Sequence, residues 1–240
     1  MRKPEKQIIQ KLLNQGILQD TSILCVCAGK SEKMLFEELN IKNVTLTNIN
    51  EDVVEGYKYE KQDAMNLTYK NDSFDYVFVS NGLHHCSSPH RALLEMYRVA
   101  RKTIIFFESK DSFLMRLAVK FNLTVDYEYV NEIPSNGYGG RNNSRIPNYI
   151  YRWTKREFEK TICSYYPVGK NKFRYYHGLD IPTKIEKNKL LTLLIKLVFI
   201  LFPGNKNVFC AVATKPVLQE DIFPWIRDNA IDYKDILSRE

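Results

Sequence analysis

Two adjacent histidines, His84 and His85, are the residues of this chain best placed to carry chemistry. They follow the apolar run Tyr76–Val79, separated from it by a short polar sequence that contains Asn81 and Gly82. An imidazole with an ordinary pKa of about 6.5 can accept a proton near neutral pH, so each histidine is a candidate general base. Either one could instead cap the following helix or pack inside the fold. The pair predicts a reaction cavity at the end of this strand.

A carboxylate occupies a comparable position earlier in the chain. Asp63 closes a short strand-like stretch, and the polar turn 70–73 separates it from the run Tyr76–Val79. In a parallel sheet, ligands bind where strands end at their carboxyl edge. Asp63 and the two histidines are therefore predicted to lie at one edge of the same sheet. The alternative is that Asp63 caps a turn or a helix.

The elements that position these residues have the pattern of a doubly wound α/β fold. Apolar runs without period-2 alternation occur at Ile23–Cys27, Val44–Thr47, Tyr76–Val79 and Thr103–Phe107. Such runs are typical of parallel strands that helices cover on both faces. The first half of the chain also has helical spacing over two segments, Glu32–Asn40 and Ser88–Ala100. Further along, the sequence predicts helices over 112–121, 154–164 and 183–203 and strands over 172–177 and 207–214.

The segment from Asp63 to Val99 closely resembles the region that follows the cofactor-binding loop in class I S-adenosylmethionine (SAM)-dependent methyltransferases. The matching residues are Asp63-Ala64, Leu67, Ser73-Phe74-Asp75, Tyr76 to Val79, Leu83-His84-His85, Pro89, Ala92, Glu95 and Arg98-Val99. The resemblance implies SAM as cofactor and a Rossmann-like fold. That fold has a mostly parallel seven-stranded sheet, helices on both faces and an insertion after the fifth strand.

The resemblance also implies a set of cofactor contacts, with Asp63 on the adenine and an acidic residue of the second strand on the ribose. Here Asn48 stands at that acidic position, and its amide could still accept one hydroxyl, with a loss of about 1 kcal/mol. In the glycine-rich loop, Cys25 replaces an acidic residue, while Cys27 and Ser31 replace glycines. Either other contacts hold SAM, or SAM binding has been lost. The residues predicted to bind the cofactor are Cys27, Ala28, Gly29, Asn48, Ile49, Asp63, Ala64, Met65, Asn81 and Gly82.

A basic and aromatic segment, 140–176, lies in the predicted acceptor half. Its nine basic and two acidic residues account for the whole net charge of +7 of the chain. Such a segment could bind nucleic acid, a phosphorylated sugar or a lipid-linked glycan, or it could be a solvated helix and strand. Residues 145–161 resemble a stretch of methyltransferases encoded among bacterial surface-polysaccharide genes. The residues predicted to bind substrate are Arg141, Arg145, Tyr149, Tyr151, Arg152 and Trp153.

The run Leu190–Phe202 is too short to span a bilayer, which takes about 20 residues. It is predicted to cover the core, and the alternative is a helix that lies in a membrane interface. The N-terminal segment lacks the apolar stretch of a secretion signal, so we expect a cytoplasmic protein, with membrane association through this run as the alternative. Five cysteines without framework spacing are expected to be reduced, buried and without a metal.

These observations predict a single methyltransferase domain over 1–240. Residues 1–108 form its cofactor half, 109–215 hold the substrate insertion and last strands, and 216–240 form a tail that packs on the surface. The predicted reaction is O-methylation of a small-molecule or glycan acceptor. Two alternatives stay open: an RNA methyltransferase, although no RNA-binding module is recognisable, and a non-catalytic module that no longer binds SAM.

Overall fold

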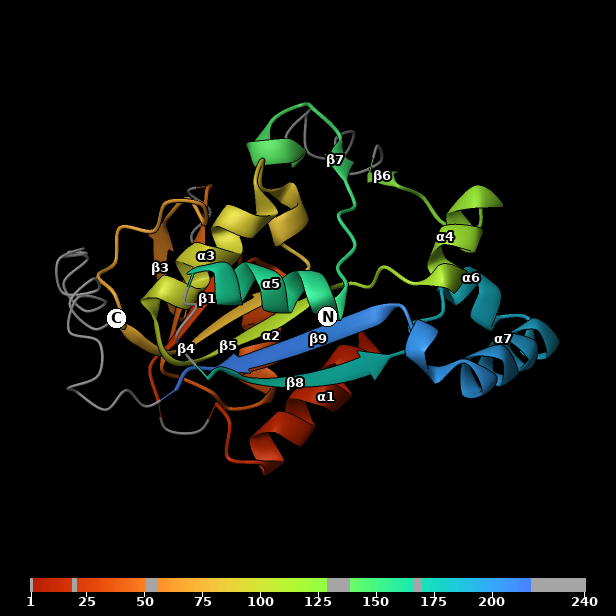
Figure 1. Cartoon of the computed structure of the whole chain (residues 1–240), viewed down its shortest axis with the longest axis horizontal. Helices are drawn as coiled ribbons and strands as arrows, with labels where there is room; N and C mark the ends of the chain where they lie inside the picture. The colour runs from red at the N-terminus through yellow and green to blue at the C-terminus, as the bar shows by residue number, and fades with distance from the viewer. Residues whose placement is uncertain (1, 19–20, 51–55, 129–138, 166–169, 217–240) are drawn as a thin grey trace, which may run out of the picture.

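A sheet of seven strands in the order β3-β2-β1-β4-β5-β9-β8 forms the centre of the molecule (Figure 1). The computed structural model describes residues 2–18, 21–50, 56–128, 139–165 and 170–216. Strands β1 to β5 are parallel, and β9 runs antiparallel to both of its neighbours, β5 and β8. The strands are β1 (Ile23–Val26), β2 (Val44–Asn48), β3 (Lys58–Lys61), β4 (Phe74–Ser80), β5 (Ala100–Ser109), β8 (Lys172–Gly178) and β9 (Val208–Thr214).

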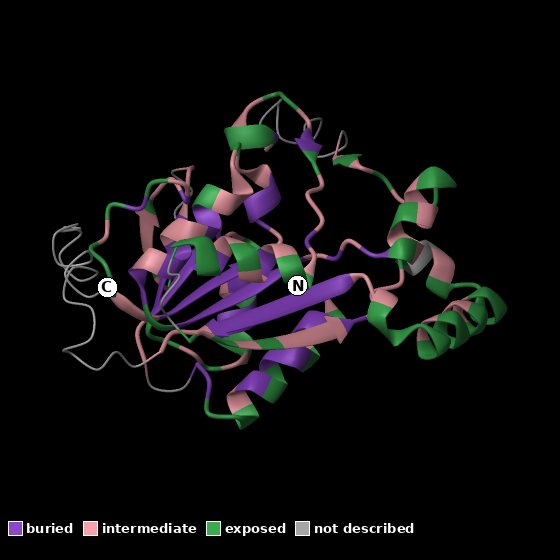
Figure 2. Cartoon of the chain, viewed as in Figure 1, coloured by how far each residue is buried: buried purple, intermediate pink, exposed green. Residues whose placement is uncertain are grey.

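Helices cover the sheet on both faces, as predicted. Side chains of α3 (Pro89–Val99) and α5 (Lys155–Tyr165) pack in one core layer, and those of α1 (Lys3–Asn14) and α2 (Lys30–Glu38) pack in the other. Successive side chains of a strand point to opposite faces, so Leu24 and Val26 belong to the first layer and Ile23 and Cys25 to the second. The central strands are accordingly buried on both sides (Figure 2).

The sequence analysis did not predict α1. Its apolar side chains Ile8, Ile9 and Leu12 follow helical spacing and are buried against the sheet. The helix starts beside the end of β4, because the guanidinium of Arg2 and the carboxylate of Glu5 both bond to Asn81. The N-terminal segment therefore contributes to the edge of the sheet where the predicted site lies.

The insertion after β5 forms a separate group of short elements. It contains α4 (Phe113–Lys120), a two-stranded ribbon of β6 (Tyr127–Glu128) and β7 (Asn148–Tyr149), and the 3-10 turn η3 (Arg141–Asn143). Between β8 and β9 lie α6 (Thr183–Glu186), α7 (Lys189–Leu201) and η4 (Pro203–Asn205). The short 3-10 helix η1 (Leu83–His85) carries the two histidines between β4 and α3.

Several expectations need correction. The predicted helix 183–203 is divided into α6 and α7, and the prediction that it covers the core is wrong, because no residue of α7 is buried. Cys25 and Cys210 are buried as expected, whereas Cys163 is exposed. The tail expected to pack on the surface lies, from residue 217 onward, outside the described residues. Among the residues that are described, no helix combines the length and apolarity needed to cross a membrane.

Candidate active site

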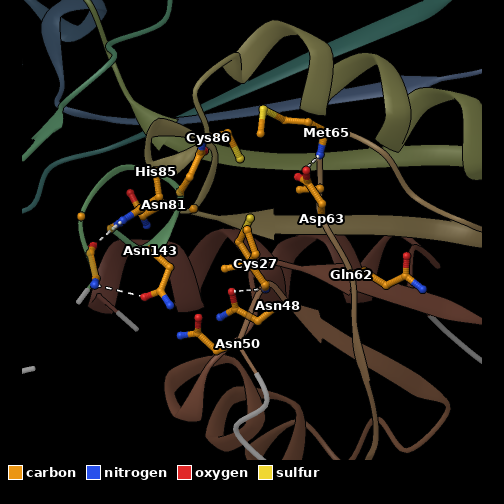
Figure 3. Close-up of a pocket in the computed structure, with 16 residues that line it drawn as sticks. Cys27, Asn48, Asn50, Gln62, Asp63, Met65, Asn81, His85, Cys86 and Asn143 are labelled. Carbon is orange, nitrogen blue, oxygen red and sulfur yellow. Dashed lines mark hydrogen bonds between the residues drawn. The ribbon is translucent and has the colours of Figure 1, made fainter. Parts of the chain in front are cut away.

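A cavity of about 220 Å³ opens at the carboxyl edge of the sheet, where the strand order reverses between β1 and β4 (Figure 3). Asp63 and Met65 lie on one side, Cys27 and Asn48 below them, and His85 and Asn143 opposite. Ala28 is buried in the second core layer, and Gly29 lines a neighbouring cavity. The other eight residues predicted to bind the cofactor line the first cavity: Cys27, Asn48, Ile49, Asp63, Ala64, Met65, Asn81 and Gly82.

The loop after β1 adopts a glycine-like backbone although a cysteine stands in it. Cys27 has φ +53°, in the left-handed region that favours glycine. Gly82 compensates on the facing loop, because a Cβ at Gly82 would lie 2.4 Å from the Cβ of Cys27. The side chain of Cys27 in the first loop is therefore accommodated because Gly82 in the second loop has none. Burial and a contact with the Cys86 thiol hold the pKa of the Cys27 thiol well above its usual range, with the Cys86 contact the larger cause.

The amide groups of this loop are largely occupied within the protein. The N–H of Ala28 donates to Thr47 O at 2.8 Å, and that of Gly29 donates to Glu32 Oε2 at 2.9 Å. Glu32 thereby caps the start of α2. Gly29 is predicted to bind the cofactor, and a cofactor group that accepts from its N–H would have to displace this bond.

The ribose end of the cavity is built from amides. Asn48 Nδ2 donates to Ala28 O at 3.0 Å, and its Oδ1 accepts from Ile49 N at 2.8 Å, so this side chain already joins the first loop to β2. Asn50 also lines the cavity, and its Oδ1 is buried without a hydrogen-bond partner among the described residues. A buried acceptor without a partner costs free energy, and a ribose hydroxyl would satisfy it. Asn50 is thus a better candidate for this contact than Asn48.

The adenine end retains its carboxylate. Asp63 Oδ1 accepts from Met65 N at 2.8 Å, a local turn bond that leaves the other carboxylate oxygen beside the cavity. The sulfur of Met65 accepts from Ser88 N at 3.3 Å, which fixes this side chain along the cavity wall. The residues present therefore fit a nucleoside with a planar base and ribose hydroxyls.

The two histidines lie beside the carboxylates of Glu108 and Glu128. His84 Nδ1 lies 3.0 Å from Glu108 Oε2, and its Nε2 lies 3.6 Å from Glu128 Oε2. The other oxygen of Glu108 accepts from Leu83 N at 2.7 Å, so the end of β5 fixes the histidine turn. The Nε2 atom of His85 lies 3.7 Å from the same oxygen of Glu128.

These surroundings shift the pKa values of the two histidines in opposite directions. Burial by itself would lower the pKa of His84, but Glu108 and Glu128 outweigh it and raise the pKa to about 10. Burial, and then the charge on His84, lower the pKa of His85 below its usual value. The contact with the His84 imidazolium at 3.6 Å lowers the pKa of Glu128 to about 2. At neutral pH, His84 is therefore a cation and His85 is neutral.

A second cavity adjoins the first and is lined by His84, His85 and Glu128. Arg2 and Glu5 of the first helix close another part of its wall. His85, Cys27, Asn48 and Asn81 border both cavities. His85 thus stands where the two spaces meet.

The residues predicted to bind substrate are placed elsewhere, and none of the six lines either cavity. Trp153 is fully buried and packs against Phe106, so its side chain belongs to the core. Tyr151 bonds to Glu157, and Arg152 forms an ion pair with Asp126. Arg141, Arg145 and Tyr149 are exposed.

Glu108, Glu128 and Asn148 were missed by the sequence analysis. Glu108 had a detectable signal, because it lies at the carboxyl end of an apolar strand, where ligand-binding residues are expected. Glu128 and Asn148 pair across the β6–β7 ribbon, a nonlocal contact that no local pattern indicates.

One group of side chains has metal-ligand character. Ligand atoms of His84, His85 and Glu128 lie within 4.8 Å of one another, and within the described parts of the chain this is the one such group. Since the positive charge of His84 already lies between the carboxylates of Glu108 and Glu128, we interpret the group as an ion-pair network. The absence of a metal stays a prediction.

The comparisons with known proteins agree with this geometry. The sequence model of a family described as a methyltransferase domain matches residues 24–107. A SAM-dependent methyltransferase from Thermotoga maritima has a similar structure, with a TM-score of 0.52 and 19% identity over 88% of this chain and 87% of that chain. One from Archaeoglobus fulgidus has a TM-score of 0.53 and 14% identity over 88% of this chain and 94% of that chain. No protein with a curated description matches the sequence. The predicted fold class is confirmed.

Proposed function

We propose that the chain is a SAM-dependent methyltransferase that methylates a hydroxyl oxygen of a small-molecule or glycan acceptor. The match of residues 24–107 to the sequence model of a methyltransferase domain supports the proposal. His85 is the general base of this proposal. The observation that carries it is the position of His85 on the border of the two cavities, one with a nucleoside-binding character and one lined by ionisable groups.

The protein's own groups can hold and move the proton. His85 Nδ1 lies 3.1 Å from Gly139 O, which can only accept a hydrogen bond, and 2.6 Å from Asn148 Nδ2, which can only donate one. Asn148 Nδ2 also donates to Gly139 O at 3.2 Å. The proposal requires the tautomer in which Nδ1 donates to Gly139 O and Nε2 holds the lone pair. An acceptor hydroxyl in the second cavity would give its proton to Nε2. The nearby carboxylate of Glu128 would stabilise the imidazolium that forms.

SAM supplies a methyl group already activated on a sulfonium, so the remaining tasks of the protein are to position the acceptor and exclude water. Asn50 and Asp63 would hold the ribose and the adenine. His84 acts as a positioning residue, since its fixed positive charge keeps His85 neutral and Glu128 ionised.

The experiment compares the variants His85→Asn and His85→Gln with the natural chain, using labelled SAM and a panel of nucleotide sugars, lipid-linked sugars and RNA. Both variants keep a polar group but lack a basic nitrogen at the Nε2 position. Turnover should fall about 10²–10⁴-fold while SAM affinity by calorimetry changes little. His90→Asn is the matched control, because His90 lies on α3 and pairs with Glu157 outside both cavities. Unchanged turnover in both His85 variants, or methylation of RNA alone, would contradict the proposal.

The pH dependence provides a second test. A general base must be unprotonated, so kcat/KM should rise with pH and level off above the pKa of His85. Since that pKa is lowered by burial and by His84, the inflection should lie below about 6.5. An inflection well above that value would assign the base to another group.

A further inference from the structure

We propose that α4, residues 121–125 and α7 together dock on a membrane surface that carries anionic phospholipids. We refer to these residues as the apolar platform. The inference goes beyond methyl transfer and does not depend on the acceptor.

The exposure of α7 is the first observation. Its sequence is as apolar as that of a buried helix, yet none of its residues is buried (Figure 2). Monomeric proteins rarely expose large contiguous apolar patches unless those patches bind something. Nine large apolar side chains between residues 190 and 202 are 40–74% exposed: Leu190, Leu191, Leu193, Leu194, Leu197, Val198, Ile200, Leu201 and Phe202.

The distribution of side chains around α7 is the second observation. At about 100° per residue, the partly buried Thr192, Ile195 and Phe199 fall on one side of the helix. Thr192 Oγ1 donates to Ile185 O at 3.1 Å, so this side faces α6. Lys189 and Lys196 lie along one border of it, and the nine exposed apolar side chains fill the rest. Lysines beside a broad apolar face are typical of helices that lie in a membrane interface.

The platform is fastened to the rest of the fold at its base. Asn205 of η4 accepts from Leu114 N and from Ser112 Oγ, which joins the ends of α7 and α4. Lys110 donates to Gly204 O in the same turn. In α4 and the residues after it, Phe113, Phe121, Leu123 and Val125 are 57–72% exposed. The turn that follows α7 therefore holds this helix beside the start of α4, and both helices carry exposed apolar side chains.

The charge of the platform selects its occupant. No acidic residue occurs between Lys187 and Lys215, and that stretch includes Lys189, Lys196 and Lys206. An anionic lipid surface attracts such a segment through its basic residues. A second copy of the chain would instead bring like charges together without an acidic partner in the segment. The length of α7, 13 residues or about 20 Å, suits a helix that lies on a membrane rather than one that spans it.

The platform also lies beside the candidate active site. α4 directly follows β5, α7 precedes β9, and α4 lies between the β6–β7 ribbon and α6 in Figure 1. Glu128 of that ribbon lines the second cavity. Docking would hold this cavity close to the lipid surface.

The test is sedimentation of the full chain with vesicles of phosphatidylglycerol and phosphatidylcholine, and with vesicles of phosphatidylcholine alone. The chain should bind the anionic vesicles, and binding should weaken with salt. The triple variant Leu194→Glu, Leu197→Glu and Leu201→Glu should lose about tenfold or more of this binding. Lys189→Gln with Lys196→Gln should reduce the preference for anionic vesicles.

Met34→Glu is the matched control, because Met34 is 66% exposed on α2, away from the platform, and should bind like the natural chain. SAM titration of each variant reports on folding, so loss of vesicle binding with intact SAM affinity would support docking separately from catalysis. Two results would overturn the inference. One is a natural chain that ignores both kinds of vesicle. The other is a natural dimer that the triple variant converts to a monomer without any vesicle binding.

Discussion

At the residue scale, the carboxylates around His84 and His85 give the two imidazoles different protonation states. Glu108 and Glu128 keep His84 charged, and the charge on His84 in turn helps to keep His85 neutral. A pair of histidines that the sequence presents as equivalent is thus divided into a fixed cation and a proton acceptor. The division rests on Glu108, a residue that packs at the end of β5 with no exposure.

This arrangement predicts a pH-dependent contribution to stability. The pKa of His84 rises from about 6.5 in the unfolded chain to about 10 in the folded one. Its contribution is therefore complete below pH 6.5, declines as pH rises and is lost above about pH 10. We expect the difference in unfolding free energy between the natural chain and His84→Gln to shrink over that range in urea titrations. A difference that stays constant from pH 6.5 to 10 would contradict the assignment.

The facing pair Cys27 and Gly82 predicts a compensating double substitution. Gly82→Ala places a Cβ against Cys27 and should destabilise the fold by about 1–3 kcal/mol, because both loops are fixed by hydrogen bonds. Adding Cys27→Gly should recover most of that loss and also remove the left-handed cysteine. Gly204→Ala is the control, since a Cβ there has no neighbour within 4 Å. Thermal unfolding of the natural chain, Gly82→Ala, Cys27→Gly and the double variant measures the coupling, and additive effects would show that the two positions are independent.

At the element scale, the attachment of α1 to the end of β4 depends on one buried carboxylate. Glu5 accepts from Arg2 Nε at 2.7 Å and from Asn81 Nδ2 at 2.8 Å. Glu5→Gln removes the buried negative charge that faces Arg2, which keeps its contacts with Asn81 and Asp180, and should cost about 1–3 kcal/mol. Glu38→Gln provides the comparison, because Glu38 of α2 forms an exposed ion pair with Lys6 of α1. This substitution should change stability by less than about 1 kcal/mol. Equal effects in denaturant titrations would mean that burial of Glu5 is unimportant.

At the scale of the whole molecule, activity should survive removal of divalent metals. Protonated His84 already supplies the cation that faces Glu108 and Glu128, and proton transfer at His85 needs no metal ion. Dialysis against EDTA is therefore expected to leave turnover and SAM affinity unchanged. Loss of turnover that returns with added Mg²⁺ or Zn²⁺ would instead make His84, His85 and Glu128 a metal site.

Local patterns sufficed for the parallel half of the fold. The apolar runs from Ile23 to Phe107 became β1, β2, β4 and β5, because a strand buried on both faces needs an unbroken apolar sequence. The same reasoning failed for α7, whose apolar sequence resembles that of a buried helix although tertiary placement leaves it exposed. It also failed for Glu128 and Asn148, since their position depends on a ribbon between segments distant in sequence.

The place of β9 between β5 and β8 has a consequence for synthesis on the ribosome. β5 pairs with β9 from Thr103 to Ser109, so the long apolar strand keeps an open edge until residues 208–214 leave the exit tunnel. An open edge of this kind recruits other strands or chaperones. The edge of β5 in the nascent polypeptide must therefore be shielded until residues 208–214 emerge, and closure of the sheet waits for β9.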